Sequence, residues 1–202
     1  MNNLIILNDA LLPKQANLIE RSMIDMRSSG TNTQADDSNF SWFHHAEVVT
    51  PDCVEKDTPK KYQHMFVHSF FESNIGVITN KINWSLVLPI MEKLDVGQCL
   101  RIKANLYPST EKIYTHGFHM DMPYSNVMTA LYFVNSNNGY IYFKPEDDKP
   151  VVKIESKKNR LVVFPNGLLH SGTTCTDEKV RVVINFNYLC GPNHPHFKHY
   201  YG

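Results

Sequence analysis

"RIKANLY" (101–107) alternates between polar and apolar residues along its whole length. Successive side chains of a β-strand point to opposite faces of the sheet, so this alternation is typical of a strand with one buried face. The apolar face would carry Ile102, Ala104 and Leu106. The polar face would carry Arg101, Lys103, Asn105 and Tyr107.

Short apolar stretches follow this strand, each bounded by turn residues, and we expect further strands at 127–134, 140–143, 160–164, 168–174 and 180–189. The pair Asn138-Gly139 can supply the positive φ angles of a hairpin turn between the first two of them. "PNG" (165–167) is a second turn signal. Strands spaced by turns, without helices between them, imply an antiparallel sandwich or barrel.

The first half of the chain has a different pattern. Apolar residues at spacings of three and four predict helices over 11–26 and 82–96, the second of them interrupted by Pro89. Residues 61–72 fit either a helix or a strand, and 27–39 form a polar loop that could cover a site. We therefore expect an α+β fold, a double-stranded β-helix (jelly roll) braced by N-terminal helices.

We expect one domain over 1–202, since the length suits a single core and no repeat or linker is visible. Its parts would be mainly helical support and loops (1–96), a jelly-roll core (97–190) and a C-terminal tail (191–202).

The charges balance, with 20 Lys and Arg against 20 Asp and Glu, which does not favour a nucleic-acid partner. The four cysteines form no CxxC pair, so we expect free thiols in a reducing compartment. No signal peptide and no apolar run long enough for a membrane helix is visible, and we expect a soluble, cytoplasmic protein.

"HGFHMDM" (116–122) places His119 and Asp121 two residues apart, so both would lie on one face of a strand. His116 has the opposite parity, and we expect it to be a loop residue. Such a triplet alone occurs by chance, but His170 and then Arg181 follow on predicted strands. Two imidazoles and one carboxylate are the ligands of non-haem iron(II) oxygenases. An arginine suits the far carboxylate of a bound 2-oxo acid, because its planar fork makes two charge-assisted hydrogen bonds.

From Arg101 to Leu189 the chain resembles the iron(II)- and 2-oxoglutarate-dependent oxygenases, in particular the prolyl-4-hydroxylase-like branch. The resemblance is carried, in order, by "NLYP", "HMD", "MTALYFVN", "RLVVFPNGLLHSG" and "EKVRVVINFNY". It implies that iron is ligated by His119, Asp121 and His170. It also implies that Arg181 binds the far carboxylate of 2-oxoglutarate and that Tyr107 contacts this cosubstrate.

Some residues depart from the family or remain open. A second cosubstrate tyrosine of relatives falls at Phe133, with Tyr132 beside it facing the other way. Asn105 shares the face of Tyr107 and could bind the cosubstrate, or could serve in structural hydrogen bonds, as could Asn185 and Asn187. The tail holds Cys190 with His194, His196 and His199, which could bind zinc but are more simply explained by packing.

The function implied is hydroxylation of a C–H bond with release of succinate and carbon dioxide. It would use iron(II), 2-oxoglutarate and dioxygen, with ascorbate as a candidate reductant. We expect a small-molecule or peptide substrate, with a peptidyl or free amino acid such as proline as the leading case. A nucleic-acid demethylase with the same chemistry is an alternative, although those relatives carry a second arginine on the last strand, which is absent here. A non-catalytic jelly-roll metal-binding protein is the other, and Arg181 argues against it. The oligomeric state is not indicated.

Overall fold

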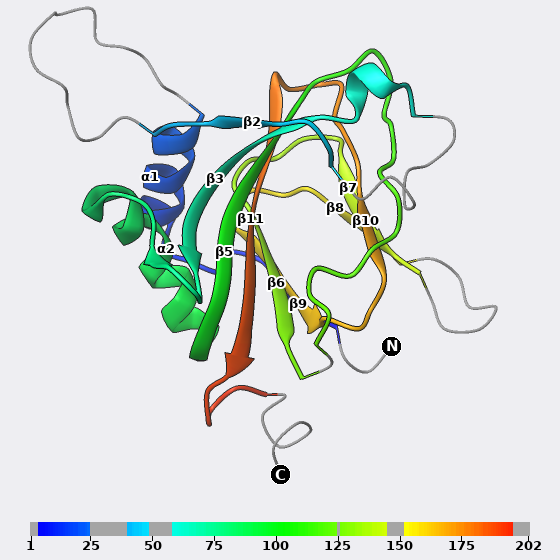
Figure 1. Ribbon diagram of the computed structural model, residues 1–202. Helices are drawn as coiled ribbons and strands as arrows, with labels where there is room; N and C mark the ends of the chain where they lie inside the picture. Colours follow the sequence, from blue (N-terminus) through cyan, green and yellow to red (C-terminus); the bar gives the residue numbers. More distant parts are fainter. Residues whose placement is uncertain (1–3, 25–39, 49–57, 125, 145–151, 196–202) are drawn as a thin grey trace, which may run out of the picture.

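Two antiparallel sheets form the body of the molecule (Figure 1). The structure is a computed structural model, and it describes residues 4–24, 40–48, 58–124, 126–144 and 152–195. The larger sheet has the strand order β1 (Ile5–Leu7), β9 (Arg160–Pro165), β6 (Met128–Phe133), β11 (Val180–Cys190), β5 (Val96–Pro108), β3 (Met65–Glu72) and β2 (Phe43–His45), with β4 (Gly76–Val77) paired to β3. The smaller sheet has the order β10 (His170–Gly172), β7 (Tyr140–Phe143) and β8 (Val152–Glu155).

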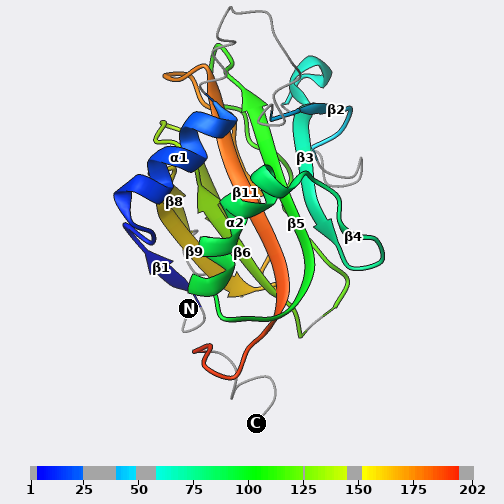
Figure 2. The ribbon, with the colours of Figure 1, turned by 90° about the vertical axis from the view of Figure 1, so that its left-hand side faces the viewer.

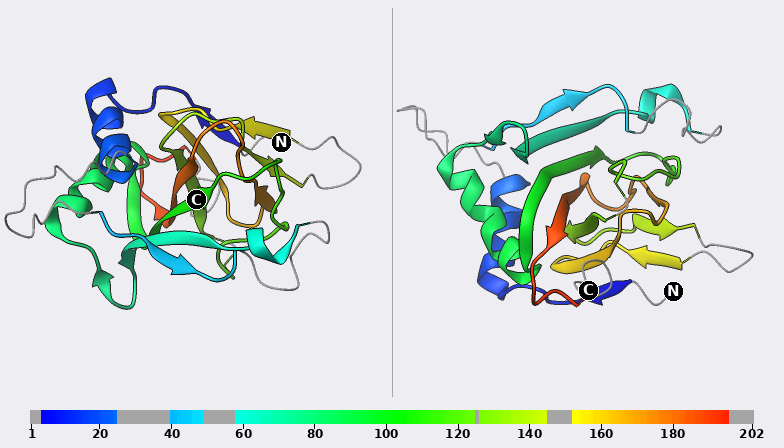
Figure 3. Two further views of the ribbon diagram at one scale, coloured as in Figure 1. Left: turned by 90° about the horizontal axis from the view of Figure 1, so that it is seen from above. Right: turned by 60° about the horizontal axis from the view of Figure 1, so that its bottom comes forward.

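The larger sheet has two faces with different partners (Figure 3). Its outer face packs against the two helices, and its inner face packs against the smaller sheet. The core under the helices includes Ile102, Ala104 and Ile184, and the core between the sheets includes Phe133 and Val183. On β11, every second residue from Val183 faces the same way, and so does the residue of β5 paired with each of them. The inner face therefore carries Arg181, Asn185 and Asn187 of β11 and Arg101, Lys103, Asn105 and Tyr107 of β5.

Both predicted helices are present and lie across the outer face (Figure 2). α1 (Pro13–Met23) buries Ala16, Ile19 and Met23, which recur at the three- and four-residue spacing of one helix face. α2 (Lys81–Lys93) begins where the Asn80 side chain accepts a hydrogen bond from the Asn83 amide at 2.8 Å. The second helix continues through Pro89 instead of ending there, and it stops before Val96, where β5 begins.

The five strands predicted after residue 126 correspond to β6, β7, β9, β10 and β11, whereas β8 was not predicted and β5 begins at Val96, before the predicted range. The ambiguous segment 61–72 is now resolved. Its second part forms β3, after a short 3-10 turn over Lys60–Tyr62. The described residues before Val96 thus contain four strands besides the helices, more strand than we expected from their composition. β3 and β2 extend the larger sheet beyond β5. The predicted loop at 27–39 lies outside the described residues.

The expected hairpin between β6 and β7 is wrong. These strands belong to different sheets, and β6 pairs with β9 and β11 instead. Among the described residues, the positive φ angles are those of Asp9, Asp95, Asn159 and Gly76, so the Asn138-Gly139 pair has none. The connection crosses from the larger sheet to the smaller one, which is how the chain closes the jelly roll. No helix within the described residues is long and apolar enough to span a membrane.

Asn159 joins the N-terminal segment to the sheet. Its side-chain oxygen accepts from the Leu11 amide at 3.0 Å and from the Tyr132 hydroxyl at 3.1 Å, and its side-chain nitrogen donates to the Leu11 carbonyl at 2.9 Å. Its backbone has a φ of 62°, in the left-handed region that asparagine tolerates better than most residues.

We predict that Asn159→Ala lowers the free energy of unfolding by about 2–4 kcal/mol, because three buried hydrogen bonds are lost and the left-handed φ becomes strained. Asn159→Gly loses the same hydrogen bonds, but glycine adopts a left-handed φ without strain. Its free energy of unfolding should therefore exceed that of the alanine variant by up to about 1 kcal/mol. Urea unfolding of both variants measures this difference. Equal stabilities would show that the φ of Asn159 costs nothing.

Candidate active site

Three side chains meet on the inner side of the larger sheet: His119, Asp121 and His170. One ligand atom from each lies within 4.8 Å of the others, and this is the one group of metal-binding side chains found among the described residues. The Nε2 atoms of His119 and His170 lie 3.9 Å and 3.6 Å from the two carboxylate oxygens of Asp121. The sequence prediction that these three residues share one centre agrees with this geometry.

The segment that carries His119 is not a regular strand. It is joined to β10 and its continuation by isolated bridges, Thr115 to Thr173 and His119 to His170. In the second bridge each backbone amide donates to the other residue's carbonyl, at 3.0 Å and 3.1 Å. The backbone pairing therefore holds the two imidazoles side by side, with ring centroids 4.6 Å apart.

The two imidazoles are oriented by backbone carbonyls. Nδ1 of His119 lies 3.1 Å from the Gly117 carbonyl oxygen, and Nδ1 of His170 lies 3.3 Å from that of Leu168. A carbonyl oxygen only accepts, so in each hydrogen bond Nδ1 carries the proton. Nε2 is then left with a free lone pair that faces Asp121, which is the arrangement required of a metal-binding histidine.

The carboxylate of Asp121 is held by side chains of β5 and β11. Arg101 approaches one oxygen at 3.4 Å, and Asn185 donates to the other at 2.9 Å. Burial alone would raise the pKa of Asp121, but His170 and Arg101 reverse this effect and lower it to about 2. Burial also lowers the pKa of His170 to about 4. Near neutral pH the group therefore consists of a carboxylate and a neutral imidazole at these two positions, the states that bind a divalent metal.

Arg181 is the second notable feature of the inner face. Its side chain is buried, with the residue only 2% exposed, and burial lowers its pKa. Nε donates to the Ser156 hydroxyl at 3.0 Å, and Cζ lies 5.4 Å from the centre of the Tyr107 ring and 5.7 Å from that of Phe133. No carboxylate within the described residues pairs with this guanidinium, which is unusual because buried charges are normally paired.

Two glycines leave room around Arg181. A Cβ atom added at Gly139 would lie 2.8 Å from Cδ of Arg181 and 2.7 Å from the Thr174 carbonyl oxygen. A Cβ added at Gly172 would lie 3.6 Å from one terminal nitrogen of the guanidinium, an ordinary contact. Gly139 is therefore required by the close approach of the Thr174 backbone and the Arg181 side chain, and not by the turn geometry that the sequence suggested.

Unpartnered polar atoms surround the space between Arg181 and the three-residue group. Among the described residues, the buried side-chain atoms without a hydrogen-bond partner are Oδ1 of Asn105, Nε2 of His116 and Oδ1 of Asn185. Asn105 and Tyr107 lie on β5, and Tyr107 is the registered partner of Arg181. Buried polar atoms that lack partners in the protein are expected where a polar ligand binds.

His116 is a residue whose place the sequence did not reveal. It is only 3% exposed, and its ring stacks on Tyr107 with centroids 5.1 Å apart. We expected a loop histidine outside the metal group. The residue does lie outside the strands, but its burial was not predicted. Four residue steps separate Thr115 from His119, whereas three separate their bridge partners His170 and Thr173. The extra residue reverses the alternation of side chains, as in a β-bulge, and turns His116 inward. His116 does not join the metal-binding group.

The remaining predicted positions are accounted for in part. Phe133 lies against Arg181, and Tyr132 faces the helices, where its hydroxyl bonds to Asn159. In the tail, both ring nitrogens of His194 are engaged, by Cys190 at 3.2 Å and Tyr188 at 3.0 Å. This favours packing over a zinc site, although His196 and His199 lie outside the described residues.

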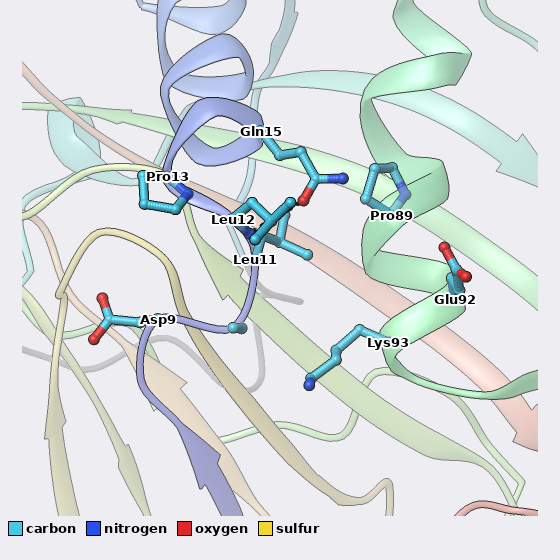
Figure 4. A pocket seen from close by; sticks show the side chains of 9 residues that line it. Asp9, Leu11, Leu12, Pro13, Gln15, Pro89, Glu92 and Lys93 are labelled. Atoms are coloured by element: carbon cyan, nitrogen blue, oxygen red, sulfur yellow. Dashed lines mark hydrogen bonds between the residues drawn. The ribbon is translucent and has the colours of Figure 1, made fainter.

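A groove of about 600 Å³ lies elsewhere, between the start of α1 and the end of α2 (Figure 4). Gln15 points across it toward Pro89, and Asp9 and Lys93 lie at its lower rim (Figure 4). None of the residues that line it belongs to the inner face of the sheet, so it is separate from the site described above.

The family model of the 2OG-Fe(II) oxygenase superfamily matches residues 103–189, which include the metal-binding group, Tyr107, Asn105 and Arg181. Those residues belong to the 2OG-Fe(II) oxygenase superfamily. Iron(II) and 2-oxoglutarate are therefore the cofactor and cosubstrate of this enzyme. The side chains present fit both. The histidines and Asp121 offer lone pairs to one metal, and Arg181 has no anionic partner among the described residues.

Solved structures with the same fold include two prolyl hydroxylases and an epimerase described as non-haem and alpha-ketoglutarate-dependent. A prolyl hydroxylase from Trichoplax adhaerens, in complex with a fragment of hypoxia-inducible factor, has a TM-score of 0.57 at 17% identity, over 94% of this chain and 84% of that one. A Pseudomonas putida prolyl-4-hydroxylase has a TM-score of 0.55 at 12% identity, over 93% and 92%. SnoN, an epimerase from nogalamycin biosynthesis, has a TM-score of 0.58 at 11% identity, over 93% and 78%. A search among curated protein sequences found no match.

His116 makes the stability of the metal-free oxygenase depend on pH. Burial first, and Arg181 second, lower its pKa from 6.5 to about 3. As pH falls below 6.5, His116 becomes protonated in the unfolded chain but stays neutral in the folded protein. This difference favours the unfolded state. This histidine stabilises the fold fully only above its unfolded pKa, and its contribution decreases as pH falls toward 3.

We predict that His116→Phe, which keeps a ring against Tyr107, removes roughly 2 kcal/mol of the stability loss between about pH 6.5 and pH 5. The measurement is urea unfolding of chelator-treated protein at both pH values. His44→Phe, at an exposed histidine of β2, is the control and should leave the slope unchanged. Identical slopes for His116→Phe and the wild type would mean that His116 titrates normally.

Proposed function

We propose that this oxygenase hydroxylates a C–H bond of a peptidyl or free amino acid, with proline as the leading case. The observation that carries the proposal is the pair of features on one inner face: a His–Asp–His group and, beyond it, a buried guanidinium without a carboxylate partner among the described residues. Iron(II) with 2-oxoglutarate and dioxygen supplies an oxidant that inserts one oxygen atom into a C–H bond, while 2-oxoglutarate leaves as succinate and carbon dioxide.

We assign the metal to Nε2 of His119, Nε2 of His170 and the carboxylate of Asp121. The carbonyls of Gly117 and Leu168 fix the tautomer of each imidazole. Arg101 and Asn185 fix the direction of the carboxylate. A metal held by these three side chains would keep coordination positions free for the cosubstrate and dioxygen.

We assign the far carboxylate of 2-oxoglutarate to Arg181. Its guanidinium can make two parallel hydrogen bonds to a carboxylate, and the aromatic rings of Tyr107 and Phe133 shield it from water. Asn105 and His116 each bring an unpartnered polar atom to this space and would complete the pocket. A metal-binding protein without turnover would have no use for this buried cation.

The inner face over β5 and β3 is where a substrate would reach the metal. The core between the sheets is built from β6, β7, β8, β9 and β11, so the smaller sheet does not cover β5 and β3. The Trichoplax prolyl hydroxylase, of the same fold, is described in complex with a peptide fragment. The zero formal charge of this chain offers no general excess of cations for a nucleic-acid backbone.

One argument from the sequence against a nucleic-acid demethylase is weaker than it seemed. β11 lacks a second arginine, but Arg101 on the neighbouring strand pairs with Asn187 and reaches Asp121, so a second arginine does lie beside the metal group. Demethylation of a nucleic acid is therefore the outcome that would replace our proposal.

We predict that Arg181→Ala weakens 2-oxoglutarate binding by roughly a hundredfold or more, because a buried charge-assisted pair is lost, while iron(II) binding survives. Asp121→Ala should instead abolish iron(II) binding. Titration of both ligands under anaerobic conditions separates the two effects. Arg160→Ala, at an arginine that bonds to Asn8 outside the site, is the control. Unchanged 2-oxoglutarate binding in Arg181→Ala would mean that another residue binds the far carboxylate.

For the substrate, we predict that iron(II)-loaded protein with 2-oxoglutarate adds one oxygen to proline, either free or within a peptide, as seen by mass spectrometry. Succinate should form in equal amount, and the Asp121→Ala variant should form neither product. A parallel reaction contains methylated single-stranded DNA. Release of formaldehyde from that DNA, with proline and the peptides unchanged, would refute the proposal.

A further inference from the structure

A cationic pair stands beside the metal group on the inner face of β5. Arg101 is the registered partner of Asn187, and Lys103 is that of Asn185. Directly opposite residues of antiparallel strands project to the same side, so both cations rise next to asparagines that contact Asp121. The pair is therefore at the metal end of the site.

Only one member of this pair is satisfied within the protein. Arg101 donates to Asn187 at 3.0 Å and approaches Asp121 at 3.4 Å. Within the described part of the chain, no hydrogen bond or ion pair reaches the ammonium of Lys103. This residue is half-buried, and its pKa is lowered to about 8, first by burial and then by the charge of Arg101. A lysine in this position gains from an anion that arrives from outside.

Lys103 is too far from Arg181 to share its anion. Arg181 is registered with Tyr107, four residues along β5 from Lys103, which corresponds to about 13 Å of strand. A 2-oxoglutarate molecule held by Arg181 and the metal group would therefore not bring its far carboxylate to Lys103. The ammonium lies at the metal end of the site, on strands that the core between the sheets does not cover.

The surroundings of Lys103 on that side are open. Its partner on β3 is Ser69. Phe43 of β2 pairs with Val67, which is the β3 partner of Asn105, so Phe43 lies on the same face of the sheet as Lys103. Phe43 is 63% exposed, and the core between the sheets does not extend to these strands. A small substrate placed here would have the ammonium on one side and apolar surface on the other.

We propose that Lys103 binds the carboxylate of the substrate, and that the substrate is a free amino acid. This rests on the proposed hydroxylase function and narrows it. Lys103 offers one positive charge, which suits a monoanion. Asp121 and Glu72 lie close enough to influence it, and their charges would oppose a phosphate dianion. An internal residue of a peptide would bring a neutral amide instead, and the lysine would stay without a partner.

The test compares each proteinogenic amino acid with its carboxamide, using the full iron(II)-loaded protein and saturating 2-oxoglutarate. Succinate formation and product mass are measured. At least one acid should be hydroxylated, with a KM at least about tenfold below that of its amide, as expected for a lost charge-assisted hydrogen bond. Lys103→Met should raise the KM of the acid about thirtyfold, remove the preference over the amide and leave the Kd of 2-oxoglutarate unchanged.

Two variants serve as controls. Lys103→Arg keeps the charge and should retain most of the preference for the acid. Lys81→Met, at an exposed lysine of α2, should behave as the wild type. These comparisons separate loss of the charge from a general disturbance of the sheet.

Three results would overturn the proposal: equal use of acids and amides, a weaker Kd of 2-oxoglutarate in Lys103→Met with the acid preference intact, or no response to any amino acid. Hydroxylation of internal proline in peptides alone would leave the proposed function standing and reject the role of Lys103. Conversely, a Lys103-dependent response to an amino acid other than proline would reject proline and support the carboxylate site.

Discussion

The guanidinium of Arg181 is buried without a carboxylate partner in the described part of the chain, and the inner face is arranged around it. Ser156 bonds to it, Tyr107 and Phe133 lie against it, and Gly139 gives its side chain room. A buried charge that is solvated only in part is costly, so the fold keeps it at the expense of stability. A dianionic cosubstrate that bridges this arginine and a metal removes that cost. Cosubstrate binding should accordingly stabilise the fold.

The buried carboxylate of Asp121, unlike the Arg181 guanidinium, has several polar and charged partners within the protein. Arg101, Asn185 and two imidazoles surround it, and they outweigh the effect of burial on its pKa. This network crosses two strands, and it works only because β5 and β11 pair in the register that sets Arg101 against Asn187. The long β5–β11 ladder therefore positions both ends of the site: the metal carboxylate near Arg101, and the cosubstrate arginine near Tyr107.

The sequence predicted much of this, and its failures have physical reasons. Alternation located β5 and an apolar stretch located β11, and the order of His119, Asp121, His170 and Arg181 indicated the chemistry. The inward position of His116 was missed because one extra residue between two bridges reverses strand parity, which spacing along the sequence does not reveal. Gly139 was misread as a turn residue because its neighbour Arg181 is distant in the sequence. Arg101 was not recognised as a partner of Asp121 because strand register depends on tertiary pairing.

The central claim is that one cosubstrate molecule joins the His–Asp–His group to Arg181. The most direct measurement is a crystal structure of the protein soaked anaerobically with iron(II) and 2-oxoglutarate. We predict one iron bound by Nε2 of His119, Nε2 of His170 and the carboxylate of Asp121, with the far carboxylate of 2-oxoglutarate on Arg181. Iron bound by other side chains, or 2-oxoglutarate bound with Arg181 still lacking an anion, would contradict the account.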